Sequence, residues 1–489
     1  MHRFITNIMS GATMNILLVN PITFFDGDFL LKSDRYRIET HPFMNMGLLY
    51  LGTVAEKLGH KVMIKKAHYS NFKIMLKKYN PSILGITCMT PQYNLAKKLA
   101  KIAKDFNRNI IIILGGYFPT FMWKYIIRNT SLFDYLFIRE SEETFKEFLM
   151  AIEHNKNIKN IRGIAFRENN KIIFTGERDL KKNIDSYSLP ARRLFKIPTI
   201  ITSRGCPNNC KFCTIKNFYK RTYRERSMQN IVEELKIMKK QGIKAVHIRD
   251  DNFLIRRKKI FEFEKILKEN NLKFDFVINT DIRQLKDDNI LKTMKKIGVK
   301  TLRVGIQYNY LKNLNMPTTR IDVENFFKKI KNYGFHVDCF VIINKGDKKE
   351  ELNDIKKELY DIKKLARNSS KADLNIGYYV MTPFPGSDIY EEFKKNNIRI
   401  DNNWSLINTA FCVYEYNDFN EKNIESLLSN IAKNKNSFSL KDLINMFWFV
   451  STSSLSNVFK IKVFSDYFKM VLQGKSKYQM NKFITRKYF

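Results

Sequence analysis

The stretch "RGCPNNCKFC", residues 204–213, holds three of the chain's six cysteines, Cys206, Cys210 and Cys213. A structural zinc site normally has four ligands in two separated pairs, and the sequence nearby supplies neither a second cysteine pair nor a histidine. Local disulfides are disfavoured, because three closely spaced thiols cannot all pair with one another. Three thiolates suit a cubane iron–sulfur cluster whose fourth iron is left open for a small-molecule ligand. The spacing therefore indicates a cluster that does chemistry.

The cysteines directly follow the first strand in a series of alternating strands and helices. Ser227 caps a helix over 227–241, and Gly242 ends it. Six strand–helix units predict a partial (β/α)6 barrel of the TIM type, with its reactive groups at the carboxyl ends of the strands. The cysteines lie at that end. The six strands are expected at 199–203, 245–248, 274–279, 301–306, 337–343 and 375–380.

The amino-terminal part of the chain predicts an α/β domain with a doubly wound parallel sheet. Its apolar strands alternate with helices, which is typical of a sheet covered on both faces. Such sheets bind ligands beyond the carboxyl ends of their strands, where this chain has Thr87, Thr90, Gly115 and Gly116. Strands are expected at 14–20, 61–66, 82–87, 109–114 and 134–138, and helices at 46–59, 70–79, 91–106, 120–129 and 142–152.

Composition shifts divide the chain into five parts. A connector at 153–198 contains a hairpin around Asn169 and Asn170, and residues 391–489 form a helix-rich carboxyl-terminal region. The complete division is an extension at 1–13, the doubly wound domain at 14–152, the connector at 153–198, the barrel at 199–390 and the helical region at 391–489.

The charge of the chain does not select a partner. Lysine and arginine number 86 against 48 acids, giving a formal charge of +38. The lysines are spread over the polar sides of amphipathic helices, which favours a basic, solvated surface over a nucleic-acid partner. The sequence has no apolar run of membrane-spanning length and no secretory signal, so we expect a cytoplasmic protein. The aromatic and basic carboxyl-terminal region leaves peripheral contact with an anionic membrane open.

The cysteine spacing, CxxxCxxC with Phe212 before the last cysteine, resembles the signature of the radical S-adenosylmethionine superfamily. The resemblance implies a 4Fe–4S cluster held by the three cysteines. It also implies that S-adenosylmethionine binds the open iron and is cleaved to a 5′-deoxyadenosyl radical. The electron would come from a donor of the flavodoxin or ferredoxin type.

Further segments resemble this superfamily at the expected strand ends. In "HIRDDNF" (247–253), the resemblance places Asp250, Asp251 and Asn252 near the methionine end of S-adenosylmethionine. "VGIQ" (304–307) resembles a segment in which Gly305 and an acid, here Gln307, approach the ribose. "TPFPGS" (382–387) resembles the turn after the sixth strand, beginning at Thr382. The turn after the fifth strand, "INKGDKKEE" (343–351), departs from the usual pattern.

The amino-terminal domain resembles that of the cobalamin-binding radical S-adenosylmethionine proteins. The resemblance rests on "PFMNMGLLYLGTVAEKLGH" (42–60), "LGGYFPT" (114–120), "RESEETF" (139–145) and "LPARRLF" (189–195). It implies that cobalamin binds near Thr87, Thr90, Gly115 and Gly116. The Asp-x-His-x-x-Gly motif is absent, and His68 lacks its flanking acid and glycine. "RESEETF" has Arg139 and Ser141 where glycines are common.

The resemblance implies cobalamin-dependent methylation of an unactivated carbon in a small-molecule or lipid-like substrate. A radical cyclisation or rearrangement would need the same parts, so it remains an alternative. A tRNA methylthiotransferase is disfavoured, because it requires three more cluster cysteines in the first domain, where only Cys88 lies. A non-catalytic sensor of cobalamin or redox state would not need an open cluster.

Overall fold

The computed structural model describes residues 13–22, 45–308, 318–343, 349–368, 373–416 and 419–431, together with short stretches between 462 and 488. The extension expected at 1–13 lies almost wholly outside the described residues. So do part of the turn at 343–351 and all of 432–461 in the helix-rich region.

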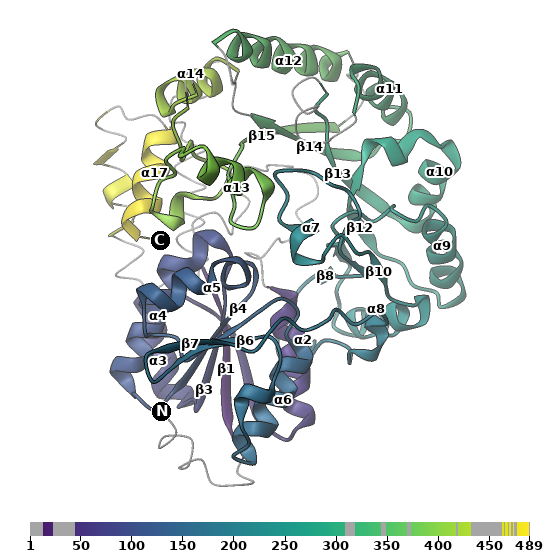
Figure 1. Ribbon diagram of the computed structural model, residues 1–489. Helices are drawn as coiled ribbons and strands as arrows, with labels where there is room; N and C mark the ends of the chain where they lie inside the picture. Colours follow the sequence, from purple (N-terminus) through teal and green to yellow (C-terminus); the bar gives the residue numbers. More distant parts are fainter. Residues whose placement is uncertain are drawn as a thin grey trace.

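The amino-terminal domain is built on a seven-stranded sheet of order β2-β1-β3-β4-β5-β6-β7, and its first five strands are parallel (Figure 1). This confirms the doubly wound α/β prediction. The strands are β1 (Asn15–Pro21), β2 (Lys61–Ala67), β3 (Ile83–Thr87), β4 (Ile111–Gly115), β5 (Tyr135–Phe137), β6 (Ile164–Glu168) and β7 (Lys171–Phe174). The helices are α2 (Met46–Lys57), α3 (Tyr69–Tyr79), α4 (Tyr93–Phe106), α5 (Tyr117–Asn129) and α6 (Glu142–Glu153).

Both faces of this sheet are buried, because successive side chains of each strand enter different cores. Ile112 and Leu114 of β4 belong to one core with residues of α3, α4 and α5, whereas Ile113 belongs to a second core with residues of α2 and α6. This two-sided burial explains why the strands read as continuous apolar runs.

The hairpin expected in the connector extends the amino-terminal sheet. Strands β6 and β7 are antiparallel, and β6 pairs with β5. Asn169 and Asn170 between them both have positive φ, 46° and 61°, as a two-residue hairpin turn requires. The sheet therefore continues to Phe174 instead of ending with β5.

The second domain is a partial barrel of six parallel strands in the order β15-β14-β13-β12-β11-β8, as the sequence predicts. The strands are β8 (Thr199–Ile200), β11 (Ala245–Ile248), β12 (Asp275–Asp281), β13 (Val299–Gly305), β14 (His336–Ile343) and β15 (Asp373–Val380). The helices outside them are α8 (Met228–Lys240), α9 (Lys259–Glu269), α10 (Asp288–Ile297), α11 (Arg320–Ile330) and α12 (Lys349–Arg367). Ser227 caps α8 by accepting a hydrogen bond from the Asn230 amide.

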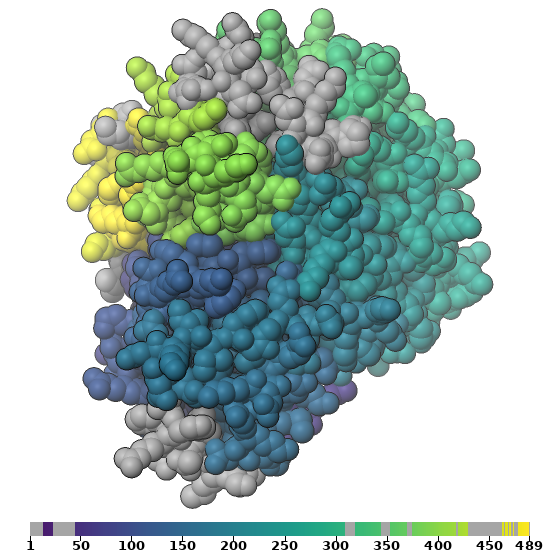
Figure 2. All heavy atoms as spheres, in the orientation of Figure 1, coloured from purple at the N-terminus to yellow at the C-terminus, as the bar shows by residue number. Residues whose placement is uncertain are grey.

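The segment that follows the barrel packs on the amino-terminal domain. Figure 2 shows its lime-coloured surface seated against the blue surface of that domain. Trp404 donates from Nε1 to the Tyr125 hydroxyl at 3.3 Å, and its ring lies 4.9 Å from that of Phe118. The helices described here are α13 (Asp388–Lys395), α14 (Glu421–Ile431) and α17 (Lys477–Tyr488). No helix in the described ranges is both long and apolar enough to cross a membrane.

Candidate active site

A cavity of about 640 Å³ lies between the carboxyl edge of the amino-terminal sheet and the mouth of the barrel. The sheet contributes the ends of β3 and β4, and the barrel contributes β8, β11 and the turn after β15. Parallel strands of both domains thus direct their carboxyl ends toward one shared space, where both kinds of domain bind ligands.

The three cysteines lie on a loop between the short strand β9 (Ser203–Arg204) and the one-turn helix α7 (Ile215–Phe218). All three are free thiols of intermediate exposure. Burial raises the pKa of Cys206 to about 11 and that of Cys213 to about 12, so metal binding must displace their protons. Gly205 starts the loop with a φ of 87°, where a Cβ would lie 2.2 Å from the Thr222 carbonyl oxygen. The sequence therefore needs glycine at this position.

The donor set fits a 4Fe–4S cluster, in which each iron takes one thiolate. Three thiols on one loop leave a single iron without a protein ligand. Within the described part of the chain, no three His, Cys, Asp or Glu side chains converge as the ligands of one metal ion would.

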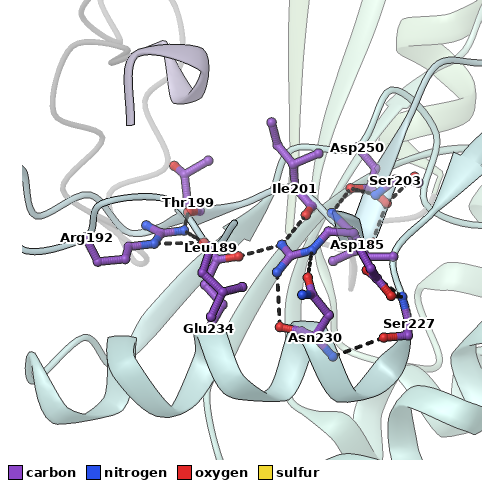
Figure 3. Close-up of polar contacts among 12 residues, drawn as sticks. Asp185, Leu189, Arg192, Thr199, Ile201, Ser203, Ser227, Asn230, Glu234 and Asp250 are labelled. Atoms are coloured by element: carbon purple, nitrogen blue, oxygen red, sulfur yellow. Dashed lines mark hydrogen bonds and ion pairs between the residues drawn. The ribbon is translucent and has the colours of Figure 1, made fainter. Parts of the chain in front are cut away.

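Asp250 fixes the start of the cysteine loop. Its carboxylate is fully buried and accepts hydrogen bonds from the amides of Thr202 and Ser203, at 2.6 and 3.1 Å (Figure 3). Both hydroxyls donate to it at 2.5 Å, and Lys259 Nζ lies 3.1 Å away. These carboxylate contacts are made with the residues that lead into the cysteine loop and with Lys259 of helix α9. Asp250 therefore faces the protein, whereas the resemblance placed it beside S-adenosylmethionine.

Asp251 points the other way, into the cavity. Its side chain lines the cavity, and Oδ2 accepts a hydrogen bond from the Gly205 amide at 3.1 Å. Burial, followed by the charge of Asp250, raises the pKa of Asp251 to about 7. Asp251 is thus the carboxylate of this pair that can meet a ligand.

The other residues predicted for S-adenosylmethionine surround the barrel mouth. Asn252 is buried and accepts hydrogen bonds from Leu254 and Thr280, both at 3.3 Å. Gln307 exchanges two hydrogen bonds with the backbone of Ile342, which ties β13 to β14 and uses both ends of its amide. The remaining three are Phe212, half-buried against the core, Gly305, the last residue of β13, and Thr382, which accepts from the Thr409 amide.

The residues predicted for cobalamin all line the cavity: Thr87, Thr90, Gly115 and Gly116. Two glycines open this edge of the sheet. A Cβ on Gly85 would lie 2.6 Å from Leu18 Cδ2, and one on Gly116, whose φ is 110°, would lie 2.8 Å from the Cys88 carbonyl oxygen. The packing of this edge therefore requires glycine at both positions, and the lack of side chains there leaves room at the cavity wall, which fits a large ligand such as cobalamin.

His68 lies outside the cavity lining. It is fully buried, caps α3 through the Ser70 amide, and places Nε2 3.3 Å from the carbonyl oxygen of Tyr488 in α17. Burial lowers the pKa of His68 to about 4. In the described structure its contacts join the amino-terminal domain to the carboxyl-terminal helix.

A buried ionic network joins the two domains beside the cysteine loop, and sequence reasoning missed it. Arg204 pairs with Glu140 at 2.9 Å and with Glu142 at 2.7 Å, and Arg224 pairs with Glu140 at 2.9 Å. Arg139 of the same segment donates to the carbonyl oxygens of Asn217 and Phe218 in α7. "RESEETF" therefore holds the cysteine loop and helix α7 through charged contacts.

A second buried network supports the strand that leads into the loop. Glu234 of α8 is fully buried and pairs with Arg192 and Arg226 (Figure 3). Arg192 also donates to the carbonyl oxygens of Ile197 and Thr199, and Arg226 donates to that of Ile201. These bonds tie the connector, α8 and β8 together, which gives Arg192 of "LPARRLF" a structural role.

Each of the two domains matches a known protein family. Residues 40–149 match the B12 binding domain, and residues 200–359 match the radical SAM superfamily. The chain is 28% identical over 439 residues to an uncharacterized methyltransferase of Pyrococcus horikoshii, covering 85% of this chain and 91% of that protein. It is 25% identical over 335 residues to an anaerobic magnesium-protoporphyrin IX monomethyl ester cyclase of Rubrivivax gelatinosus, covering 64% and 58% respectively.

Among solved structures, the cobalamin-dependent S-adenosylmethionine radical enzyme OxsB superimposes with a TM-score of 0.65 at 14% identity, covering 94% of this chain and 71% of that one. The fold and the site thus define a two-domain α/β enzyme in which a B12 binding domain precedes a radical SAM domain. The chain combines a B12 binding domain with a radical SAM domain, the arrangement of the cobalamin-binding-domain radical S-adenosylmethionine proteins that its motifs resemble. The cofactors of these domains are a 4Fe–4S cluster, S-adenosylmethionine and cobalamin.

Proposed function

We propose that the enzyme transfers a methyl group to an unactivated carbon of a small-molecule or lipid-like substrate. The observation that carries the proposal is the single cavity bounded by both domains. Gly115 and Gly116 of the B12 binding domain line it, and so does Thr214, the neighbour of Cys213. A reactive carbon radical must react with the methyl donor before it reacts with solvent. Both reactions therefore need to take place in one space that excludes water.

In this proposal Cys206, Cys210 and Cys213 hold the cluster. The bound cofactors supply the radical chemistry and the methyl group. The protein positions the reactants and excludes water, and Asp251 is the charged side chain placed to contact S-adenosylmethionine. Asp250 and Gln307 act indirectly, by fixing the loop and the barrel strands. Further contacts to S-adenosylmethionine are assigned to Phe212, Asn252, Gly305 and Thr382, and contacts to cobalamin to Thr87, Thr90, Gly115 and Gly116.

The similarity to a methyltransferase supports methyl transfer over ring closure. That similarity extends over 91% of the Pyrococcus protein, whereas similarity to the cyclase covers 58% of the cyclase. The electron donor in this proposal is a protein of the flavodoxin or ferredoxin type.

The test is anaerobic reconstitution with iron, sulfide and cobalamin, followed by measurement of 5′-deoxyadenosine and S-adenosylhomocysteine. The wild-type protein should form 5′-deoxyadenosine, and alanine at Cys206, Cys210 or Cys213 should abolish it without unfolding the chain, because the loop is not part of a core. Cys412→Ala is the matched control, because Cys412 is buried away from the loop and should leave turnover intact. Turnover in all three loop variants would refute the assignment.

A further inference from the structure

Basic side chains gather inside the barrel, below its mouth. His247, Arg249 and Asp251 alternate along the β11 segment, and all three line the cavity. Because the parallel strands run toward the mouth, Arg249 lies one layer deeper than Asp251, and His247 lies one layer deeper still. The cavity therefore descends past the level of the cysteine loop and meets positive charge at its deep end.

Arg303 contributes a second guanidinium at the level of Arg249. In the sheet, Arg303 pairs with Asn279 on one side and with Asp338 on the other. Its guanidinium lies 4.9 Å from the ring centroid of Phe340, a contact that holds it in place. Its Nε is 3.8 Å from Asp338 Oδ2, too far for a hydrogen bond. Among the described residues, this buried Nε has no hydrogen-bond partner.

One carboxylate oxygen of the nearby acid, Asp338, has other partners. Asp338 Oδ1 lies 3.2 Å from His336 Nε2 and accepts a hydrogen bond from Asn375 at 3.2 Å. The buried arginines of the domain junction differ, since Arg204 has carboxylate oxygens at 2.7 and 2.9 Å. Within the described ranges Arg303, whose side chain is 16% exposed, has only the 3.8 Å ion pair with Asp338, whereas Arg204 has two closer carboxylates. A poorly compensated charge is costly, so an added anion would stabilise the Arg303 guanidinium.

The strand register places both arginines one residue pair above His247, toward the barrel mouth. Burial, and then the charges of Arg249 and Arg303, lowers the pKa of His247 well below the ordinary value. Both guanidinium groups are therefore near the imidazole, which stays neutral. Each guanidinium carries five N–H donors, so Arg249 and Arg303 can donate to one ligand in addition to their contacts within the protein.

We propose that the substrate carries an anionic group, a carboxylate or a phosphoryl group, that binds inside the barrel between Arg249 and Arg303. This inference rests on the proposed function and names its substrate class. Guanidinium groups match the planar, two-oxygen edge of such anions and form paired hydrogen bonds with them. Binding the anion at the deep end would leave the rest of the substrate in the wider part of the cavity, between the cysteine loop and the B12 binding domain.

The test is equilibrium dialysis of the reconstituted enzyme with labelled inorganic phosphate, in parallel with labelled acetate. Wild-type enzyme should bind at least one of these anions saturably at one site. Arg249→Gln and Arg303→Gln should each weaken that binding about tenfold or more, as expected for loss of a charged hydrogen bond. Lys300→Gln is the matched control: Lys300 lies on the same strand, is partly exposed and pairs with Asp275, so its loss should leave binding unchanged. Binding of phosphate alone indicates a phosphoryl group, and binding of acetate alone indicates a carboxylate.

S-Adenosylmethionine also carries a carboxylate, so its binding is measured in the same variants. We expect unchanged affinity for S-adenosylmethionine and unchanged formation of 5′-deoxyadenosine. Equal loss of S-adenosylmethionine affinity would overturn the inference, as would absence of saturable anion binding or equal weakening by Lys300→Gln. Arg303→Lys keeps the charge and serves if the glutamine variant does not fold. Failure of the wild-type enzyme to cleave S-adenosylmethionine would instead refute the proposed function, and the anion measurement would still be readable.

Discussion

Asp250 and Asp251 are adjacent carboxylates with opposite roles, and replacing each by asparagine separates those roles. Asp250→Asn leaves Lys259 buried without its closest carboxylate and turns an amide toward hydroxyl and ammonium donors. Removing one partner of a buried ion pair typically costs about 3–5 kcal/mol. Glu225, 3.6 Å from Lys259, remains and favours the lower end, about 3 kcal/mol.

Asp251→Asn should cost much less. An asparagine oxygen still accepts the hydrogen bond from the Gly205 amide, and one altered hydrogen bond is worth about 1 kcal/mol. The change also removes the repulsion between the two carboxylates. Its effect should appear in the ligand: the reconstituted Asp251→Asn enzyme should hold its iron but bind S-adenosylmethionine more weakly.

The assay is urea unfolding of both variants without the cluster, under anaerobic reducing conditions. With a slope of roughly 3 kcal/mol per molar urea, Asp250→Asn should lower the midpoint of the barrel transition by about 1 M. Lys259→Met in the Asp250→Asn background should recover part of the loss, because it removes the uncompensated charge. Equal midpoints for the two asparagine variants, or an unchanged midpoint for Asp250→Asn, would refute this division of roles.

The junction between the domains yields three shorter predictions. Gly116→Ala should reduce retained cobalamin, measured by absorbance after desalting, because its φ of 110° and a Cβ 2.8 Å from Cys88 O force the edge to shift. Glu140→Gln should destabilise the chain by about 3 kcal/mol in urea unfolding, because it leaves Arg204 and Arg224 without a shared carboxylate. Burial lowers the pKa of His68 in the folded chain to about 4, from its ordinary value of 6.5. Between pH 4 and pH 6.5, His68 therefore binds a proton in the unfolded chain but not in the folded chain. Stability should therefore fall as pH drops from 6.5 to 4, and His68→Asn, which keeps a capping side chain, should flatten that decline.

Local patterns predicted the strands because both sheets bury their strands on two faces. The six barrel strands and the five parallel strands of the first domain form where apolar runs occur. Ser227 and Gly242 predicted the start and the end of α8, because helix caps depend only on residues next to the helix ends. Local patterns predicted the hairpin at 164–174 but not its place in the sheet. That place depends on pairing with β5, an open sheet edge more than twenty residues away in the sequence.

The orientation of site residues depended on tertiary contacts that a motif does not contain. "HIRDDNF" suggested three polar residues near a ligand, but strand alternation places Asp250 against Thr202 and Lys259 and leaves Asp251 in the cavity. Counting back from Asp251 in steps of two residues would also have identified Arg249 and His247 as facing the cavity. Contacts such as Glu140 with Arg204 join segments 64 residues apart, and sequence spacing gives no sign of them.

Helix α5 links the cavity edge of the B12 binding domain to the barrel domain. Gly116 and Tyr117 at its start border the B12-binding edge. Further along, Phe121 packs so closely on Gly386 that a Cβ there would lie 2.4 Å from the ring, and Asn217 of α7 donates to the Gly386 carbonyl oxygen at 2.8 Å. One helix therefore contacts the turn after β15, and that turn contacts the helix following the cysteines. A shift of either domain would break these contacts, so they hold the sheet edge near the cysteine loop and favour a preformed site.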